Sequence, residues 1–390
     1  MGVRQLLRAD RIATLFSISP LDLRKVSRSN PGARRALAAW ILGCAVFYSA
    51  AVDTHNSVQE VALDCVQPQL AVAGRGVVLT CGREGTVFTA TSDDGGRTFT
   101  PLGRVATVRE LPLGRRRGPR IAADRDALVV SAVVGRGGSP GSTGDLMAWR
   151  SSDRGATWAG PVRINSVPDA AREGLHALAA GGGRFVAVWL DLAQPGTRLF
   201  VSESRDGGRR WSAGRELYVS PSGSVCECCH PSVAMSPSGT FVAMFRNNLE
   251  GYRDMYVVDD SGRAERLGTG RWRLSACPMD GGGLAHDAAG RAFTIWRREQ
   301  TIYIAQIGRP EQPLGDGQDA AIVACGSHIA AAWLGPDGLV LASDRGAKPS
   351  LVDVRGTNPT LASSGTDALV LAWQHGSQTR VRQYKVAAGL

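Results

Sequence analysis

The stretch SSDRGATW at residues 151–158 decides how this chain folds, because variants of it recur along the sequence. SDDGGRTF at residues 92–99 has the same pattern, and SRDGGRRW at residues 204–211 departs from it only in an Arg at the Thr position. In this stretch, which we call the box, the Asp carboxylate can accept the turn's own amide hydrogens, Gly tolerates a positive φ and the aromatic ring can pack between sheets. We interpret the box as a structural turn. Its key residues are Ser92, Asp94, Gly96, Phe99, Ser151, Asp153, Gly155, Trp158, Ser204, Asp206, Gly208 and Trp211.

A longer repeat surrounds the boxes. Each copy has a short strand of the type Pro-x-Leu-Ala, a Gly turn and a second apolar strand that typically closes on an aromatic residue. A third and usually a fourth apolar run follow, and no amphipathic helical period is present, so the pattern predicts many short strands. The copies begin at Pro68, Pro119, Leu175, Pro231, Gly283, Ile322 and Pro359.

This repeat predicts an all-β fold, a β-propeller of four-stranded antiparallel blades. We expect seven blades, with six as the alternative if one of the short late copies is not a full blade. The last copy lacks room for a fourth strand, and residues 57–63 can supply it and close the ring, which removes the free sheet edges. No linker interrupts the pattern, so residues 53–390 are expected to form a single domain.

Over nearly all of residues 57–390 the chain resembles the sialidase superfamily of Asp-box, or BNR-repeat, propellers. The resemblance implies an exo-sialidase type of glycoside hydrolase, which holds the sugar carboxylate with three Arg residues and uses a Tyr nucleophile. Arg120 follows its Pro by one residue, whereas the family's first Arg precedes the Pro by two. Tyr252, Tyr256, Tyr303 and Tyr384 do not match the nucleophile's context. The resemblance therefore assigns no catalytic residue, and enzymatic activity stays open.

Composition and charge exclude one class of partner. The chain has 390 residues, 43% of them hydrophobic and 21% charged, with a net charge of +10. Residues 1–35 hold eight basic and two acidic residues, so the remaining 37 basic and 33 acidic residues leave a net charge of only +4. This balance provides no basic stripe for a phosphate backbone and argues against nucleic acid. Only three of the 45 basic residues are Lys, so an Arg alone is a weak indication of a site.

The N-terminus has the pattern of an export segment. Residues 1–35 are basic, and residues 36–52 form an uncharged apolar run that predicts a signal peptide or a retained signal anchor. Ile41-Leu42-Gly43-Cys44 also resembles a lipobox in which Cys44 would carry the lipid. We expect the propeller to be extracytoplasmic: periplasmic, secreted or held outside the membrane. Membrane contact is expected only through an uncleaved anchor or a lipid on Cys44.

Polar residues gather where predicted inner strands begin and second strands end, two places that share one face of a propeller. Residues 226–230 and 277–282 precede the inner strands of neighbouring blades, and Arg246 and Arg297 directly follow closing aromatics. A polar mouth of this kind is the default ligand site, and a solvated rim is the alternative. The candidate ligand-binding residues are Arg120, Glu173, His176, Asp191, Arg246, Asn247, Asn248, Arg253, Asp254, Asp280, Arg297 and Arg298.

The cysteines allow several interpretations. In an exported protein we expect disulfides, one joining Cys277 to a member of residues 226–229 and clamping two blades. The alternatives are a metal site, with copper favoured over zinc, a covalent haem on the Cys-x-x-Cys-His pattern of residues 226–230, and a redox-active thiol. The disulfide candidates are Cys226, Cys228, Cys229, Cys277, Cys65 and Cys81, and the metal candidates are Cys226, Cys228, Cys229, His230 and Cys277.

These observations favour two main functions. The first is an exported sialidase-like propeller whose Arg- and Cys-bearing mouth binds an anionic carbohydrate or another carboxylate, with hydrolysis left open and no cofactor expected. The second is a non-enzymatic copper or redox protein centred on residues 226–229 and Cys277. A scaffold for protein partners is the third alternative.

Overall fold

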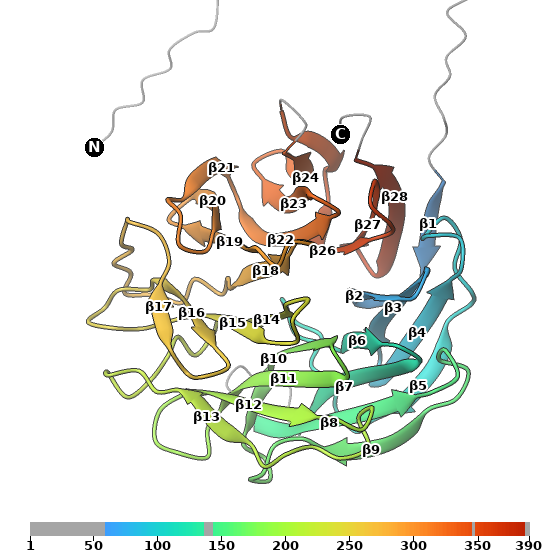
Figure 1. The fold of residues 1–390 in the computed structure, drawn as a ribbon, viewed down its shortest axis with the longest axis horizontal. Coiled ribbons are helices and arrows are strands. Elements are labelled where there is room, and N and C mark those ends of the chain that lie inside the picture. The colour runs from blue at the N-terminus through green and yellow to red at the C-terminus, as the bar shows by residue number, and fades with distance from the viewer. Residues whose placement is uncertain (1–58, 136–142, 345–347, 387–390) are drawn as a thin grey trace, which may run out of the picture. The chain divides into compact units, whose positions relative to one another are not determined.

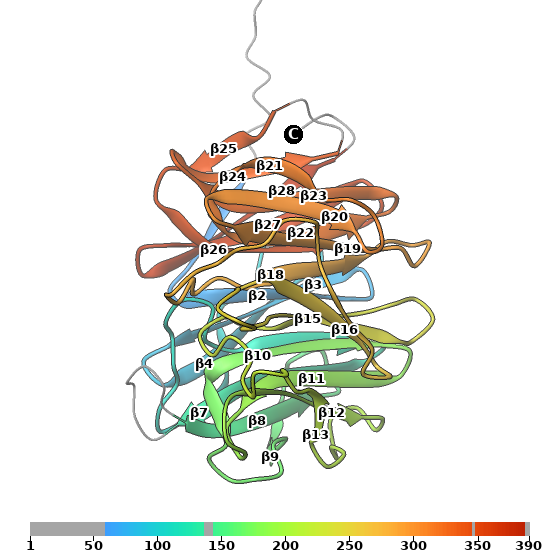
Figure 2. The ribbon, with the colours of Figure 1, turned by 90° about the vertical axis from the view of Figure 1, so that its left-hand side faces the viewer.

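The computed structural model describes residues 59–135, 143–344 and 348–386, and every regular element in these ranges is a β-strand. The strands form blades arranged around a common centre (Figure 1), and Figure 2 shows the same blades edge-on. Residues 1–58, with the predicted export segment and Cys44, lie outside the described residues. The described part contains no helix long and apolar enough to cross a membrane.

Five of the sheets have four antiparallel strands each. The first is β2 (Val66–Ala73), β3 (Gly76–Arg83), β4 (Thr86–Ser92) and β5 (Gly103–Thr107). The next three are β14 (Ser232–Met235), β15 (Phe241–Arg246), β16 (Met255–Asp259) and β17 (Ala264–Arg266); β18 (Gly282–His286), β19 (Ala292–Arg298), β20 (Thr301–Gln306) and β21 (Gln312–Asp316); and β22 (Gln318–Cys325), β23 (His328–Gly335), β24 (Gly338–Ser343) and β25 (Ser350–Asp353). The fifth joins β26 (Gly356–Ser363), β27 (Ala368–His375) and β28 (Gln378–Lys385) to β1 (Glu60–Leu63).

The sixth sheet has eight strands, which corrects the expectation of seven separate four-stranded sheets. One half consists of β6 (Arg120–Asp124), β7 (Ala127–Gly135), β8 (Thr143–Ser151) and β9 (Ala159–Arg163), and the other of β10 (Ala171–Gly181), β11 (Arg184–Asp191), β12 (Arg198–Ser204) and β13 (Arg215–Tyr218). The halves join because β10, the longest strand at 11 residues, begins early enough for Ala171 and Arg172 to pair with Gly144 and Thr143 of β8. The described chain is therefore an all-β propeller of four-stranded antiparallel blades, two of which are hydrogen-bonded into one sheet.

The ring is closed by the two ends of the propeller, as the sequence predicts. Residues Glu60–Leu63 of β1 pair antiparallel with Thr379–Arg382 of β28, so the first described strand becomes the outer strand of the last blade. The predicted Cys65–Cys81 disulfide is present beside this closure. The Thr379 hydroxyl donates a hydrogen bond to the Cys65 carbonyl oxygen at 2.8 Å, which ties the disulfide to β28.

Burial explains why the second strands of the blades are continuous apolar runs. β11 (RFVAVWLD) is buried at seven of its eight residues and β27 (ALVLAWQH) at six of eight, because each blade packs against a neighbour on both faces. Outer strands such as β5 (GRVAT) contain only exposed or half-buried residues. The hydrophobic core is therefore a series of clusters between successive blades, rather than one central core.

The three boxes fold as predicted, at the ends of β4, β8 and β12. In the second box the Ser151 hydroxyl donates to Asp153 Oδ1 at 2.7 Å, while Thr157 donates to the same carboxylate through its amide at 2.9 Å and its hydroxyl at 2.5 Å. Gly155 donates its amide to Ser151 Oγ with φ at +88°, a conformation that favours glycine. Trp158 then packs into the apolar cluster between the β2–β5 blade and the β6–β9 half, and Phe99 and Trp211 do the same at their own interfaces.

Candidate functional site

Three cysteines meet in the turn that leads into β14. This thiol triad consists of Cys226 and Cys229, which are buried, and Cys228, which is half-buried. Their Sγ atoms are 3.3 Å apart for Cys226 and Cys229, 3.6 Å for Cys226 and Cys228, and 3.9 Å for Cys228 and Cys229. The turn is anchored to β15, because Cys226 donates its amide to the Arg246 carbonyl oxygen at 2.9 Å. The local sequence thus brings three sulfur atoms to one point.

The spacing of the triad suits a metal ion. With metal–sulfur bonds of about 2.3 Å, two thiolates on one ion lie about 3.8 to 4.0 Å apart, close to the distances observed here. Within the described residues these three sulfurs form the one group of ligand atoms close enough together to share an ion. All three donors are soft thiolates, which select copper(I), zinc or iron–sulfur chemistry over calcium or magnesium.

Charge within the triad is uneven. Hydrogen bonds from the Cys228 and Cys229 thiols lower the pKa of Cys226, and the nearby Arg246 guanidinium lowers it further. The hydrogen bond to Cys226 in turn raises the pKa of Cys228, and burial raises the pKa of Cys229. Deprotonation is therefore favoured at Cys226 and opposed at Cys228 and Cys229, and a metal ion that binds all three sulfurs would have to displace their protons.

The expected disulfide between Cys277 and this group is not formed, because the triad thiols face one another across their own turn. Cys226, Cys228, Cys229 and Cys277 are all free, and Cys277 is exposed beside Cys228. His230 does not join the triad either. Its Nδ1 accepts a hydrogen bond from the Gly281 amide at 3.3 Å, and burial, with the charges of Arg116, Arg120 and Arg246, holds its pKa well below the usual value.

A covalent haem does not fit this arrangement. The pattern at residues 226–230 would place an iron ligand at His230, yet that side chain is buried and 8% exposed. A Cβ placed on Gly281 would lie only 2.8 Å from the imidazole ring, so the backbone of the next blade covers the ring closely. A porphyrin requires an open face at its axial ligand, which this ring does not offer.

Two of the candidate arginines are fully engaged by the protein itself. Arg246 is 1% exposed and donates from Nε, Nη1 and Nη2 to the carbonyl oxygens of Asp280, Arg253 and Arg297. Arg120 is 7% exposed, and burial lowers its pKa to about 9. Its guanidinium also donates to backbone carbonyl oxygens, including those of His176 and Arg116. A ligand carboxylate would have to displace these bonds, so neither guanidinium forms an open anion site.

Arg297 and Asp280 lie beside Arg246, as their predicted places in neighbouring blades imply. Arg297 Nη1 lies 3.9 Å from Asp280 Oδ2, and Arg246 and Arg297 both pack over the Trp272 ring. Burial and the Asp319 carboxylate raise the pKa of Asp280. Asp280 Oδ2 accepts the Asp319 amide at 3.0 Å, so this group also connects two blades.

The remaining candidates have structural partners. His176 Nε2 and Ser131 Oγ are 3.0 Å apart, and Glu173 pairs with Arg117 at 3.0 Å. The other partners are as follows: Asp191 accepts from Trp189 Nε1, Asn247 donates to the Tyr218 hydroxyl, Asn248 donates its amide to Asn247, Asp254 accepts from the Trp272 amide, and Arg298 pairs with Glu311. Only Arg253 differs, because its buried Nε and Nη1 atoms make no hydrogen bond within the described residues.

Sequence reasoning missed a residue that joins blades far apart in the sequence. Arg116, in the loop before β6, is 7% exposed and forms a salt bridge with Asp319 of β22. It also donates to the Pro359 carbonyl oxygen at the start of β26. Asp319 has a positive φ of 60° at a bulge in β22, and its carboxylate pairs with Arg116. No sequence signal separates Arg116 from its neighbours Arg115 and Arg117.

Comparisons with known proteins support the fold alone. No family model matches the chain, and no curated protein matches it. Among solved structures, an alpha-L-arabinofuranosidase from Fusarium graminearum matches at a TM-score of 0.50 and 12% identity, over 85% of this chain and 98% of that one. A streptogramin B lyase matches at a TM-score of 0.50 and 9% identity, over 84% of this chain and 98% of that one.

A Hadza microbial sialidase is also similar, at a TM-score of 0.47 and 15% identity. This chain is covered to 83% in that match and spans 66% of the sialidase chain. At such identities the shared property is the β-propeller fold, which serves hydrolases and lyases alike in these relatives. The class of protein defined here is therefore a β-propeller with a thiol triad at one end of its inner strands.

Proposed function

We propose that the protein is a non-enzymatic metal-binding propeller that holds one soft ion, copper(I), on Cys226, Cys228 and Cys229. The observation that carries this proposal is the convergence of three Sγ atoms within 3.3 to 3.9 Å of one another. Three thiolates in a triangle suit a soft d¹⁰ ion, and soft sulfur ligands favour copper(I). When bound, the ion would supply a thiophilic centre suited to storage or transfer of the metal.

The surroundings suit an anionic metal–thiolate centre. Three thiolates and one copper(I) ion carry a net charge of −2, and the fixed positive charge of Arg246 offsets part of it, as its effect on Cys226 indicates. Arg246 is held by three backbone carbonyl oxygens, so it would keep its place as the metal enters or leaves. We therefore assign Arg246 a positioning and electrostatic role and no direct contact with a ligand.

An extracytoplasmic location belongs to the same proposal. The Cys65–Cys81 disulfide supports it, since structural disulfides persist mainly in oxidising compartments. In such a compartment three thiols in contact would oxidise unless something protected them. A bound ion would give that protection.

A competition titration tests the metal site. The reduced protein is titrated with copper(I) against a chromophoric copper(I) chelator, and we expect one ion per chain. Cys226→Ser and Cys229→Ser should each weaken binding by at least about 100-fold. Cys325→Ala, which removes a buried thiol at another blade interface, serves as the matched control and should bind as the wild type does. Equal binding by wild type and Cys226→Ser would refute the site.

A second candidate function is favoured by Arg253. Its Nε and Nη1 atoms are buried in the loop between β15 and β16 without a hydrogen-bond partner among the described residues, so the guanidinium keeps donors that an anionic group could engage. We propose anionic-ligand binding here, with a carboxylated glycan as the class to test and hydrolysis unassigned. Binding of sialosides on a glycan array that falls at least tenfold in Arg253→Gln would support it, and unchanged binding would exclude Arg253.

We also infer that the ring has seven blades, counting each half of the eight-stranded sheet as one. The inference is supported by the weak link between the halves, in which β10 and β8 share two residue pairs, against eight between β7 and β8. An electron-density map of a crystal would test the count, and six repeats of inner strand around the channel would overturn it.

A further inference from the structure

The aromatic of each box packs between its own blade and the preceding one, and the β22–β25 blade keeps part of the box sequence without this aromatic. Residues 343–347 have the sequence SDRGA, identical to residues 152–156 of the second box. Two residues further on, Trp158 of that box is matched by Pro349. The strand pairing agrees with this alignment, because Leu341 pairs with Ser350 as Arg150 pairs with Ala159, with the same spacing along the chain.

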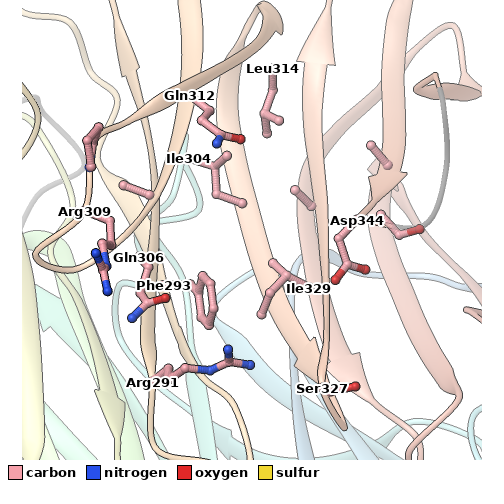
Figure 3. Close-up of a pocket in the computed structure, with 15 residues that line it drawn as sticks. Arg291, Phe293, Ile304, Gln306, Arg309, Gln312, Leu314, Ser327, Ile329 and Asp344 are labelled. Atoms are coloured by element: carbon pink, nitrogen blue, oxygen red, sulfur yellow. The ribbon is translucent and has the colours of Figure 1, made fainter.

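The missing aromatic ring leaves a pocket at the corresponding place. Trp158 packs into the cluster between its blade and the preceding one, whereas Pro349 is exposed. Between the β18–β21 and β22–β25 blades lies a pocket of about 550 Å³, which we call the inter-blade pocket (Figure 3). Its volume is within the range of small-molecule sites. It lies at the end of the strands opposite the thiol triad, since Phe293 is near the start of β19, and Arg297, whose carbonyl oxygen accepts a hydrogen bond from Arg246, is near its end.

The floor of the inter-blade pocket is apolar and its rim is charged. Phe293, Ile304 and Ile329 contribute the floor, with Leu314 beyond them (Figure 3). Each of these side chains also belongs to the apolar cluster between the two blades. The floor therefore corresponds to the surface that a box aromatic would cover, and in this pocket that surface is accessible.

The rim selects the charge of an occupant. Arg309 lines the pocket and is exposed, and its guanidinium makes no ion pair with any described residue. Arg291, the second cation, already pairs with Asp287 at 2.6 Å, and the acidic Asp344 lies 3.3 Å from His328. The contact between Asp344 and His328 is ionic only when the imidazole is protonated, so the positive charge on the rim that has no ion pair is that of Arg309, and an anionic group would complement it.

We propose that the inter-blade pocket is a binding site for a small aromatic carboxylate. The planar ring takes the position that Trp158 holds in its own box, on Phe293, Ile304 and Ile329, and the carboxylate pairs with Arg309. The aromatic class follows from the internal comparison, since Phe99, Trp158 and Trp211 fill the equivalent gaps. The site is independent of the thiol triad and of any metal.

Indole-3-acetate is the probe, with tryptamine as its cationic counterpart. We expect indole-3-acetate to bind the full chain with submillimolar affinity, to shift the methyl resonances of Ile304 and Ile329, and to bind at least tenfold more tightly than tryptamine. Pro349→Trp restores the box aromatic, so it should abolish binding and raise the Tm. Arg309→Gln should weaken binding at least threefold, while Arg205→Gln, an exposed Arg beside another box, should leave it unchanged.

Three results would overturn the proposal. They are no binding of indole-3-acetate at millimolar concentration, binding that leaves the Ile304 and Ile329 methyls unshifted, and equal affinity in Arg309→Gln and wild type. Should Pro349→Trp fail to fold, the methyl shifts of the wild type and the affinity of Arg309→Gln decide the question, since Arg309 is exposed and its replacement does not disturb the core.

Discussion

The second box and the stretch that matches it in the β22–β25 blade share five consecutive residues yet build different surfaces. At residues 151–158 the Ser, Asp, Thr and Trp positions are all present, and the turn is closed by side-chain hydrogen bonds and covered by a ring. In the later stretch Ala342, Lys348 and Pro349 replace Ser, Thr and Trp. The residues that supply the Ser hydroxyl, the Thr hydroxyl and the ring in the second box are thus replaced, and a pocket lies at that blade interface.

The box sequence is therefore kept in blades where it has a structural role alone, and it is altered in the part of the chain that carries the candidate binding sites. The three boxes that keep their aromatic belong to the blades from β2 to β13, whereas the thiol triad, Arg246 and the inter-blade pocket all belong to blades from β14 onward. The following predictions test this contrast between complete and altered repeats.

The largest effect is expected for the box aromatic. Trp158→Ala removes a half-buried ring from an inter-blade cluster and should lower the free energy of unfolding by about 2 to 3 kcal/mol, less than for a fully buried Trp. Pro349→Ala, at the matching exposed position, should change it by less than about 0.5 kcal/mol. Urea denaturation measures both, and equal effects would remove the distinction between the two stretches.

A pH dependence is expected next, from a buried histidine in the complete-box part of the ring. Burial, with the charge of Arg120, lowers the pKa of His176 from 6.5 to about 3. Between these pH values His176 is protonated in the unfolded chain but not in the folded chain, so the free energy of unfolding falls as the pH drops below 6.5.

For this single group the loss is about 2 kcal/mol at pH 5 relative to pH 7. The free energy of unfolding of His176→Gln should fall by correspondingly less between pH 7 and pH 5. Urea denaturation at the two pH values would measure this difference. His230, whose pKa is also lowered, remains in the variant and contributes equally to both proteins. An identical pH dependence of wild type and variant would mean that His176 is protonated in the folded state.

The smallest effect is expected for the box carboxylates. Asp153→Ala removes the acceptor of three hydrogen bonds and should lower the Tm by about 2 °C. Asp344→Ala, in the altered stretch, should lower it less. Hydrogen bonds from Thr157 and Ser151 lower the pKa of Asp153 to about 2, so the contribution is present above pH 3.8 and is lost as the pH falls through 2. Thermal melts at pH 7 and pH 2 would measure the difference, and an Asp344→Ala loss as large as that of Asp153→Ala would contradict the comparison.

Sequence reasoning was most successful where the determinants are local. The boxes, the blade repeat, the closing strand β1 and the Cys65–Cys81 disulfide all follow from short-range patterns or from the count of strands. The propeller fold could therefore be predicted from residues that lie close together along the chain.

Features that depend on orientation and long-range pairing could not be predicted in this way. Arg246 follows its closing aromatic as expected, but its sequence position does not reveal that three carbonyl oxygens occupy its donors. The salt bridge between Arg116 and Asp319 joins residues 203 positions apart. Likewise, the pairing of β10 with β8 depends on where one strand begins, a boundary that composition does not define.

X-ray absorption at the copper edge is the most direct test of whether the thiol triad is a metal site. We predict a shell of three sulfur atoms at about 2.3 Å around one copper(I) ion per chain, and loss of one of these sulfur atoms in Cys228→Ser. A shell of nitrogen or oxygen, or a protein that takes up no copper after full reduction, would contradict it. In that case the triad would be a redox or structural element of the turn before β14.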